Sequence, residues 1–345
     1  MSPALPQSNA PATVVGQGAF QYQALPNWAH LPPGWSFVEA VGLVTDSSGN
    51  ALVFNRGEHP VIVFDRQGQF LRSWGEGFFV RPHGIQIGPD DSIYCVDDFD
   101  HAVHKFTSDG RLVFTLGTRG QSSDTGARTV DYRTIRQAAG PFNFPTNLAL
   151  APGGEMVIAD GYGNARIHVF SPDGRLLRSW GEPGWGPAQF HVPHGIVIDR
   201  TGTIYVADRE NSRLQLFSLE GRLLGEWTSL ARPCEVAIDD DQNVYVAELG
   251  YRAGMFPGNT PPPGATTGGR LSIFNASGEL QARFGGGDNP CAAGDFFAPH
   301  DVWIDRFGDM YVSEVTMSAG GNRGLVSPDC HTLQKFVRIS PPGSS

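Results

Sequence analysis

A unit of about 40 residues recurs six times along this 345-residue chain, and this repeat constrains the fold more than any single motif. Its clearest copy, residues 190–227, holds four short apolar segments: GIVID, TIYVAD, RLQLF and LLGEW. Turns rich in Gly, Asp and Asn separate these segments. Short runs rich in β-branched and aromatic residues predict strands. Four strands per unit and six units predict an all-β fold, a six-bladed β-propeller.

The repeat boundaries predict a single propeller domain over residues 20–340, preceded by a disordered segment at residues 1–19. The sixth unit lacks a fourth strand, and we expect the segment that begins at Phe20 to supply it. Such a closure removes an exposed sheet edge. The expected blades cover residues 39–75, 80–118, 141–181, 190–228, 231–286 and 296–340.

Charge and composition restrict the function classes. The net charge of −10 and the pI near 5.4 disfavour nucleic acids and anionic membranes as partners, since both require clustered Lys and Arg. No apolar run approaches the ~18 residues of a membrane span, and the first residues show no signal-peptide pattern. We therefore expect a cytoplasmic protein, most simply a monomer, that acts on a small molecule.

The four cysteines show neither CxxC nor zinc-finger spacing. Free thiols are the default expectation for a cytoplasmic protein. Cys95 lies in a strand-like run and is best explained as a small buried apolar residue. Cys291 and Cys330 lie in loops of the last repeat, and the sequence leaves open whether they pair.

One phrase, Pro-His, begins the second, fourth and sixth repeats and contributes His83, His194 and His300. The intervening units carry Thr146 and Cys234 at the same point. In a closed ring, alternate units lie about a third of a turn apart, so the three imidazoles would surround one axis. A purely structural histidine would suit all six units equally. The pattern therefore predicts a metal site with three histidine ligands.

Three neutral imidazoles with open coordination positions are typical of a catalytic zinc site, whereas a structural zinc site usually has four protein ligands. Zinc is the leading candidate, although imidazole also suits iron, nickel and copper. The other histidines, such as His168 in a third strand, are expected to be structural.

The topology of a blade places further features on the same face as the histidines. The starts of first strands, the loops between second and third strands, and the connections between blades all lie at one end of the ring. Arg56 and Tyr162 occupy matching positions in two such loops. Three long insertions, at residues 119–140, 249–269 and 316–330, lie there too. Function usually resides in loops carried by a rigid scaffold, so we expect the site on this face.

The chain resembles the lyase domain of the peptidylglycine α-amidating enzymes (peptidyl-α-hydroxyglycine α-amidating lyase), a six-bladed propeller of NHL-type repeats. The resemblance covers roughly residues 35–340 and rests on phrases that occur in order: FNRGEHP, RPHGI, FPTNLAL, ADGYGNARI, PHGIVID, VADREN and APHDV. It implies an enzyme that cleaves the C–N bond of an N-acyl-α-hydroxyglycine or a related small α-hydroxy-amide, releasing an amide and glyoxylate.

Carried over position by position, the resemblance implies three ligands of a catalytic zinc: His83, His194 and His300. It also makes Tyr162 and Arg56 the active-site residues. Tyr162 would be the general base for the substrate hydroxyl, and Arg56 would hold a carboxylate or an oxyanion. Arg209, in the matching loop of the fourth unit, is a further substrate-binding candidate. A salt bridge to a neighbouring blade explains Arg209 equally well.

The resemblance further implies a structural calcium in the channel. Its ligands would be the Asp301 carboxylate and the main-chain carbonyls of Leu43 and Ile85, which are the oxygen donors that calcium prefers. Two positions depart from the family: Gly163 replaces a disulfide-bonded cysteine, and Ala298 replaces a methionine. We therefore expect a different substrate pocket around a preserved metal centre.

Two other functions remain open from the sequence. One is a metal-dependent hydrolase or hydratase, which would use a metal-activated water on a lactone, amide or ester. The other is a non-catalytic NHL scaffold that binds proteins. The acidic charge argues against RNA as a ligand, and a bare scaffold would not require three histidines at equivalent positions.

Overall fold

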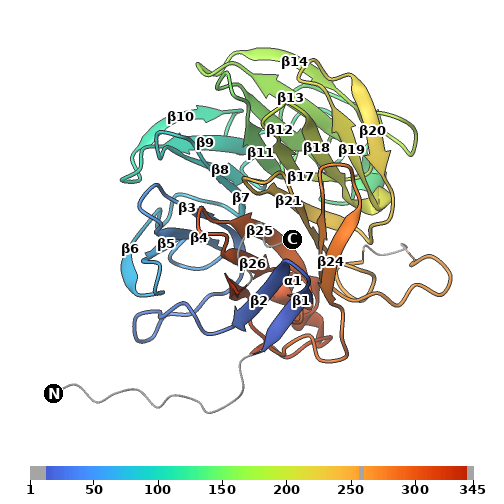
Figure 1. Cartoon of the computed structure of the whole chain (residues 1–345). Coiled ribbons are helices and arrows are strands. Elements are labelled where there is room, and N and C mark those ends of the chain that lie inside the picture. Colours follow the sequence, from blue (N-terminus) through green and yellow to red (C-terminus); the bar gives the residue numbers. More distant parts are fainter. Residues whose placement is uncertain (1–12, 256–259, 340–345) are drawn as a thin grey trace.

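The computed structural model describes residues 13–255 and 260–339, which form a ring of antiparallel sheets whose first strands lie around the centre (Figure 1). The prediction of a six-bladed β-propeller is confirmed. Each of the first five blades is a four-stranded meander. Neighbouring first strands pack against one another around the ring, and contacts between β25 (Pro299–Ile304) and β3 (Ala40–Thr45) close it.

The strands follow in chain order. Blade one contains β3, β4 (Ala51–Asn55), β5 (Val61–Phe64) and β6 (Phe70–Trp74). Blade two contains β7 (Pro82–Ile87), β8 (Ile93–Asp97), β9 (Ala102–Phe106) and β10 (Leu112–Leu116). Blade three contains β11 (Asn147–Leu150), β12 (Met156–Asp160), β13 (Arg166–Phe170) and β14 (Leu176–Trp180). A short β15 (Glu182–Pro183) and β16 (Gln189–Phe190) pair before blade four.

Blade four contains β17 (Pro193–Ile198), β18 (Ile204–Asp208), β19 (Arg213–Phe217) and β20 (Leu223–Trp227). Blade five contains β21 (Pro233–Ile238), β22 (Val244–Glu248), β23 (Arg270–Phe274) and β24 (Leu280–Gly285). Blade six contains β25, β26 (Met310–Glu314) and β27 (Leu333–Arg338), with the short helix α1 (Thr316–Ala319) in its insertion. The single-turn 3₁₀ helices are η1 (Tyr132–Thr134), η2 (Arg209–Asn211) and η3 (Gly321–Arg323).

The second strand of every blade is buried along its whole length. Such a strand has neighbours on both faces, which explains the continuous apolar runs in the sequence. Outer strands such as β20 are half-exposed. Tight turns join the strands: the Asp65 carboxylate accepts the N–H groups of Gln67 and Gln69, and Gly68 adopts a φ of +84° that favours glycine.

A side-chain latch recurs in all six blades. Its acceptor is the last residue of the second strand: Asn55, Asp97, Asp160, Asp208, Glu248 and Glu314. Each accepts one or two N–H groups from the chain just before the first strand of its own blade. In blade two, Asp97 accepts from Val80 at 2.6 Å and from Arg81 at 2.8 Å. The latch therefore orients the backbone immediately before the Pro-His phrase.

The N-terminal segment closes the ring. Strand β2 (Phe20–Leu25) pairs antiparallel with β27, with Tyr22 opposite Arg338. Part of the segment expected to be disordered, Val14–Gln17, forms instead strand β1, because β2 offers it a free edge. Residues 1–12 of that segment lie outside the described residues. The hairpin β1–β2 lies beside β24 of blade five (Figure 1).

Cys291 and Cys330 form a disulfide, the pairing that the sequence left open, so the default of free thiols does not hold for these two cysteines. The bond joins the chain before β25 to the loop before β27, two segments that the sequence separates by 39 residues. Cys95 is free and buried, as expected for a small apolar residue, and Cys234 is also free and buried.

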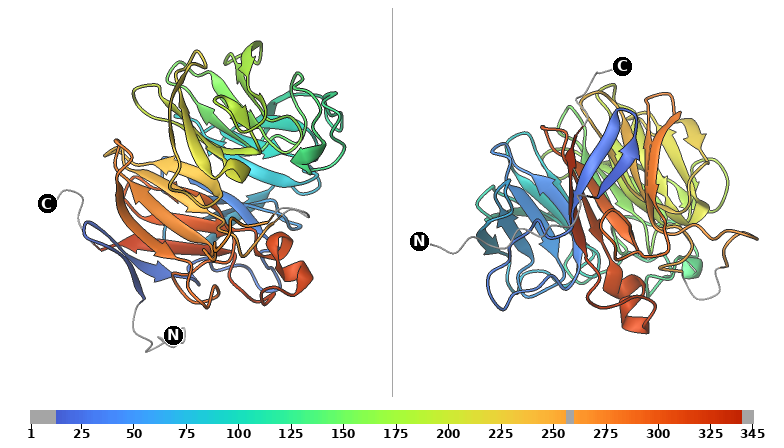
Figure 2. Two further views of the ribbon diagram at one scale, coloured as in Figure 1. Left: turned by 90° about the vertical axis from the view of Figure 1, so that its right-hand side faces the viewer. Right: turned by 60° about the horizontal axis from the view of Figure 1, so that its bottom comes forward.

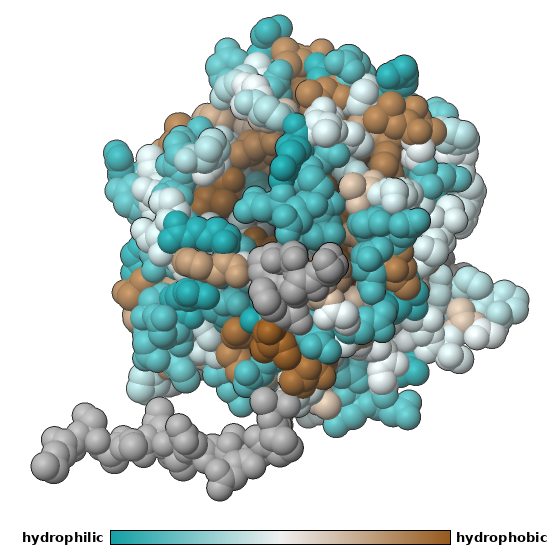
Figure 3. All heavy atoms as spheres, viewed as in Figure 1, coloured by the Kyte–Doolittle hydropathy of each residue, from teal (hydrophilic) through white to brown (hydrophobic). Residues whose placement is uncertain are grey.

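The two faces of the ring differ. Helix α1 and the insertions project on one face, opposite the end of β27 (Figure 2). The face viewed in Figure 3 is largely polar, with apolar side chains in separate patches.

No helix within the described residues is both long and apolar enough to cross a membrane.

Candidate functional site

The three predicted histidines meet at the axis of the ring. His83, His194 and His300 are the second residues of β7, β17 and β25, and all three are buried. Their ring centroids are 4.8, 4.8 and 4.9 Å apart, which is close to an equilateral triangle. Each offers a nitrogen within 4.8 Å of the others, a spacing at which one metal ion can bind all three.

The neighbouring blades fix the orientation of each ring. The Nδ1 atoms lie 2.7–2.8 Å from main-chain carbonyl oxygens: His83 at Thr146, His194 at Cys234 and His300 at Val41. A carbonyl oxygen can only accept, so each Nδ1 carries a hydrogen and each Nε2 presents a lone pair. The three blades that carry no histidine at the axis thus supply the carbonyls that orient the axial histidines of the other three.

The environment keeps these imidazoles neutral. Burial, followed by the charge of neighbouring imidazoles, lowers the pKa of His83 well below its usual range. Burial and Arg209 lower the pKa of His194 in the same way, and burial lowers the pKa of His300 to about 3. The Nε2 of His300 has no hydrogen-bond partner among the described residues. A neutral donor set with one orphaned nitrogen fits a transition metal.

Tyr162 lies directly against this triangle. Its hydroxyl is 3.2 Å from Nε2 of His83 and 3.1 Å from Nε2 of His194. The side chain is only 7% exposed, and it packs in a cluster with Tyr132 and Phe144. The tyrosine that the sequence placed on the histidine face therefore reaches the histidines themselves.

Arg56 and Arg209 approach from two other sides. Arg56 Nε donates to the Pro82 carbonyl at 2.9 Å, and its Nη1 pairs with Glu39 at 2.8 Å. Its Nη2 is buried and finds no partner in the part of the chain that the structure describes. Arg209 Nη1 donates to the Tyr162 hydroxyl at 3.2 Å. Arg209 thus contacts Tyr162 of the neighbouring blade as well as Glu210, the next residue in its own blade.

A pocket of about 140 Å³ opens beside these residues. All three insertions contribute to its wall, through Val130, Gly254, and Ser318 with Ala319. Three arginines line it as well: Arg56, Arg81 and Arg209. A small pocket with cationic groups on several sides suits a small anionic molecule.

Two residues of this site escaped the sequence analysis. Arg81 lines the pocket and pairs with Asp98 at 2.9 Å. Glu39 neutralises Arg56, and its Oε1 accepts the N–H of Ser318 in α1. Position relative to the repeat is the signal that could have found Arg81, since it comes two residues before His83.

The predicted calcium residues lie further along the channel, around a cavity of about 220 Å³. Asp301 and Ile85 line this cavity, whereas Leu43 approaches Asp301 through its N–H group, at 2.8 Å. A second carboxylate that the sequence analysis missed, Glu235, lies in the same cavity and accepts from the Asn147 amide. Burial raises the pKa of Asp301 to about 7, and burial together with Asp301 raises the pKa of Glu235 well above its usual range.

Asp97, Asp100 and His104 form a second cluster with metal-ligating atoms. Blade three contains the matching arrangement, in which His168 contacts Asp160 at 3.2 Å and Ser179 at 2.7 Å. His104 likewise contacts a hydroxyl, that of Thr115, on the neighbouring strand. We therefore attribute the cluster to hydrogen bonding within a blade.

Comparisons with known proteins agree with the repeat and with the fold. The NHL repeat family matches residues 190–217. Over 199 residues the chain is 36% identical to NHL repeat-containing protein 3 of Mus musculus, covering 52% of this chain and 54% of that protein. Over 156 residues it is 31% identical to peptidyl-alpha-hydroxyglycine alpha-amidating lyase 1 of Drosophila melanogaster, covering 42% of this chain and 26% of the lyase. The matches thus span about half of the first relative and a quarter of the second.

Among solved structures, a gluconolactonase of Xanthomonas campestris superposes with a TM-score of 0.61 at 12% sequence identity, covering 97% of this chain and 98% of that chain. At this identity the likeness concerns the propeller fold. The similarity to amidating lyases that the sequence motifs indicated is confirmed by the partial match to the Drosophila melanogaster lyase.

Proposed function

We propose that the protein is a metal-dependent lyase that cleaves the C–N bond of an N-acyl-α-hydroxyglycine, or of a related small α-hydroxy-amide, to an amide and glyoxylate. One observation carries the proposal: three buried Nε2 atoms converge beside the Tyr162 hydroxyl, in a pocket that also contains the unpartnered Nη2 of Arg56. The partial homology to amidating lyases supports it.

His83, His194 and His300 would hold the metal through Nε2. A bound Zn²⁺ would supply Lewis acidity that makes the substrate hydroxyl easier to deprotonate.

The residues around the metal site would perform the remaining tasks. Arg56 would bind the substrate carboxylate through its free Nη2, and Glu39 would keep the guanidinium in place. Tyr162 would take the proton of the substrate hydroxyl, while Arg209 stabilises negative charge on the tyrosine oxygen. As the carbinol C–O bond becomes a carbonyl, the C–N bond breaks. Tyr162 would then return the proton to the amide nitrogen.

The charge of the pocket favours this reaction over lactone hydrolysis. Arg56, Arg81 and Arg209 suit a substrate with a carboxylate, whereas a lactone is neutral. A scaffold that only binds proteins would have no use for three neutral imidazoles whose rings are oriented by main-chain carbonyls.

Glyoxylate release from α-hydroxyhippurate tests the activity. We expect turnover by the metal-loaded protein and a loss of kcat of about 10²–10⁴-fold in Tyr162→Phe, because the general base is gone. Tyr205→Phe, which removes a buried phenol of blade four outside the site, is the matched control. Equal turnover by the wild type and Tyr162→Phe would refute the role of Tyr162. Absence of any glyoxylate would refute the lyase assignment.

Metal analysis tests the site independently of substrate. We expect about one transition-metal ion per chain after reconstitution, and its loss in His83→Ala, because two imidazoles remain where three are required. His168→Gln removes an equally buried imidazole from blade three and should keep the metal. A His83→Ala protein that retained full metal content would contradict the proposed site.

A further inference from the structure

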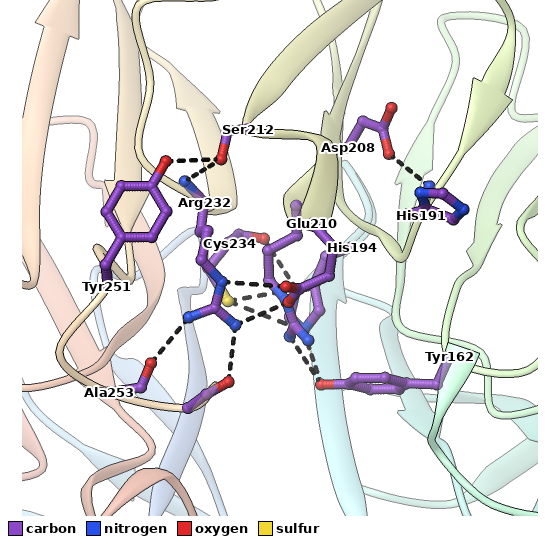
Figure 4. A network of polar contacts seen from close by, with 12 residues as sticks. Tyr162, His191, His194, Asp208, Glu210, Ser212, Arg232, Cys234, Tyr251 and Ala253 are labelled. Atoms are coloured by element: carbon purple, nitrogen blue, oxygen red, sulfur yellow. Dashed lines mark hydrogen bonds and ion pairs between the residues drawn. The ribbon is translucent and has the colours of Figure 1, made fainter. Parts of the chain in front are cut away.

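Two buried arginines share one carboxylate next to the candidate site (Figure 4). Glu210 Oε1 accepts from Arg209 Nε at 2.9 Å and from Arg232 Nη2 at 2.7 Å. The side chains of Arg232 and Glu210 are each only 2% exposed. Burial alone would raise the pKa of Glu210, but the charges of Arg209 and Arg232 outweigh it and lower the pKa. Glu210 is therefore an ionised link between the two arginines.

Arg232 uses its remaining donors on the blade-five insertion. Its Nη1 donates to the carbonyls of Gly250, at 3.2 Å, and Ala253, at 2.8 Å. Its Nη2 also donates to the carbonyl of Gly254 at 2.7 Å. Together with the two bonds to Glu210, all five N–H groups of the guanidinium have acceptors. The Arg232 side chain thus binds three main-chain carbonyls within residues 250–254.

Both ends of this chain of contacts reach the pocket. Leu249 and Gly254 of the insertion line it directly. At the other end, Arg209 donates to the Tyr162 hydroxyl and lies over the Tyr162 ring, 5.2 Å from its centroid. Figure 4 shows Arg232 and Glu210 between the insertion and Tyr162. A simple packing role would not require a continuous line of hydrogen bonds and ion pairs from the pocket wall to the tyrosine.

We propose that Arg232 is a positioning residue, which holds residues 249–254 of the blade-five insertion in place and, through Glu210 and Arg209, orients Tyr162 over the three histidines. The catalytic part of this inference rests on the proposed function, whereas the mechanical part does not. The insertion that shapes the pocket and the tyrosine that faces the histidines are thereby coupled. A substitution that displaces the insertion should accordingly lower kcat more than it raises KM.

Arg232→Lys is the test variant, because lysine keeps the charge beside Glu210 but cannot reach all of the carbonyls. Arg213→Lys is the matched control: Arg213 is a buried arginine of blade four, the blade that carries Arg209 and Glu210, and it is bound to Asp208 and Glu226, outside the line to Tyr162. Hydrogen exchange measured by mass spectrometry should increase about tenfold at residues 249–254 and around Tyr162 in Arg232→Lys, and at neither place in Arg213→Lys.

Kinetics supply the second readout. We expect kcat of Arg232→Lys to fall about 10–100-fold with KM changed less than about threefold, since small misplacements of a catalytic group act on turnover. Glu210→Gln should reproduce both effects and serves if Arg232→Lys does not fold. Unchanged exchange around Tyr162 in both variants would overturn the proposal. A wild type without lyase activity would refute the proposed function alone, because the exchange experiment still decides the role of Arg232.

Discussion

At the scale of single residues, two glycines at the third position of first strands, Gly42 in β3 and Gly195 in β17, make room in the channel. Gly42 lets Asp301 and Ile85 approach: a Cβ at Gly42 would lie 3.0 Å from the Asp301 carboxylate and 2.9 Å from the Ile85 side chain. Gly195 likewise makes room for Glu235, whose Oε1 would lie 2.5 Å from a Cβ there. The glycines thus create the space in which two carboxylates face one cavity. A divalent cation would favour the ionised form of both carboxylates, as the calcium site implied by the family resemblance would require.

Calcium binding should stabilise the protein through Asp301. At a concentration of 100 Kd, Ca²⁺ should raise the free energy of unfolding by about 2.7 kcal/mol in the wild type. Asp301→Asn should abolish this gain, whereas Asp239→Asn, at the rim of a different cavity, should keep it. Thermal unfolding with and without Ca²⁺ measures both. The same Ca²⁺ effect in Asp301→Asn and the wild type would rule this site out.

At the scale of the strand, the latch explains how the connection between two blades can place a histidine side chain accurately. The first strand is preceded by a connection between blades, which would otherwise be free to shift. In blade two, Asp97 binds the N–H groups of Val80, Arg81 and Asp100, and thereby holds the chain two residues before His83. Blade one performs the same task with Asn55, which shows that an amide oxygen is sufficient.

Asp97→Ala should destabilise the fold by about 2–4 kcal/mol, because buried N–H groups lose their acceptor. It should also weaken metal binding about 10–100-fold through displacement of His83, since residues that orient ligands contribute on this scale. Asp97→Asn should keep most of the stability and most of the metal affinity, because an amide oxygen can accept the same N–H groups, as that of Asn55 does in blade one. Chemical denaturation and metal titration measure the two effects. Equal losses in the alanine and asparagine variants would exclude a latch role.

At the scale of the whole molecule, ring closure depends on the N-terminal segment. Strand β2 covers the edge of β27 and buries Phe20, Tyr22 and Ala24. The Tyr22 hydroxyl also contacts that of Tyr245 in blade five, at 3.0 Å. Closure therefore connects blade six to the rest of the ring from the outside as well as through β25 and β3.

Deletion of residues 1–25 should expose the edge of β27 and lower the free energy of unfolding by about 5 kcal/mol or more, because several buried side chains are lost. The exposed edge should also promote self-association. Deletion of residues 1–12 leaves β1 and β2 intact and is the control. Thermal unfolding and size-exclusion chromatography measure the outcomes. A monomeric 1–25 deletion of unchanged stability would show that closure through β2 is dispensable.

The sequence by itself determined the repeat, the strands and the face on which the loops gather, because periodicity and turn residues are local properties of the chain. It also placed His83, His194 and His300 at equivalent positions, and the ring then brings equivalent positions to one axis. Only the tertiary structure decided that Val14–Gln17 forms a strand, since it pairs with β2, which in turn is held by the distant β27. The same is true of the disulfide between Cys291 and Cys330, which are 39 residues apart.

The same holds for the contacts that complete the site. Carbonyls of intervening blades orient the imidazoles, Glu39 holds Arg56, and Glu210 joins Arg209 to Arg232. No local pattern marks these partners. The carbonyls and Arg232 meet their targets only when neighbouring blades pack against one another, and Glu39 meets Arg56 only when β3 and β4 pair. Periodicity predicts which residues point to the axis, and the closed ring decides which groups hold them there.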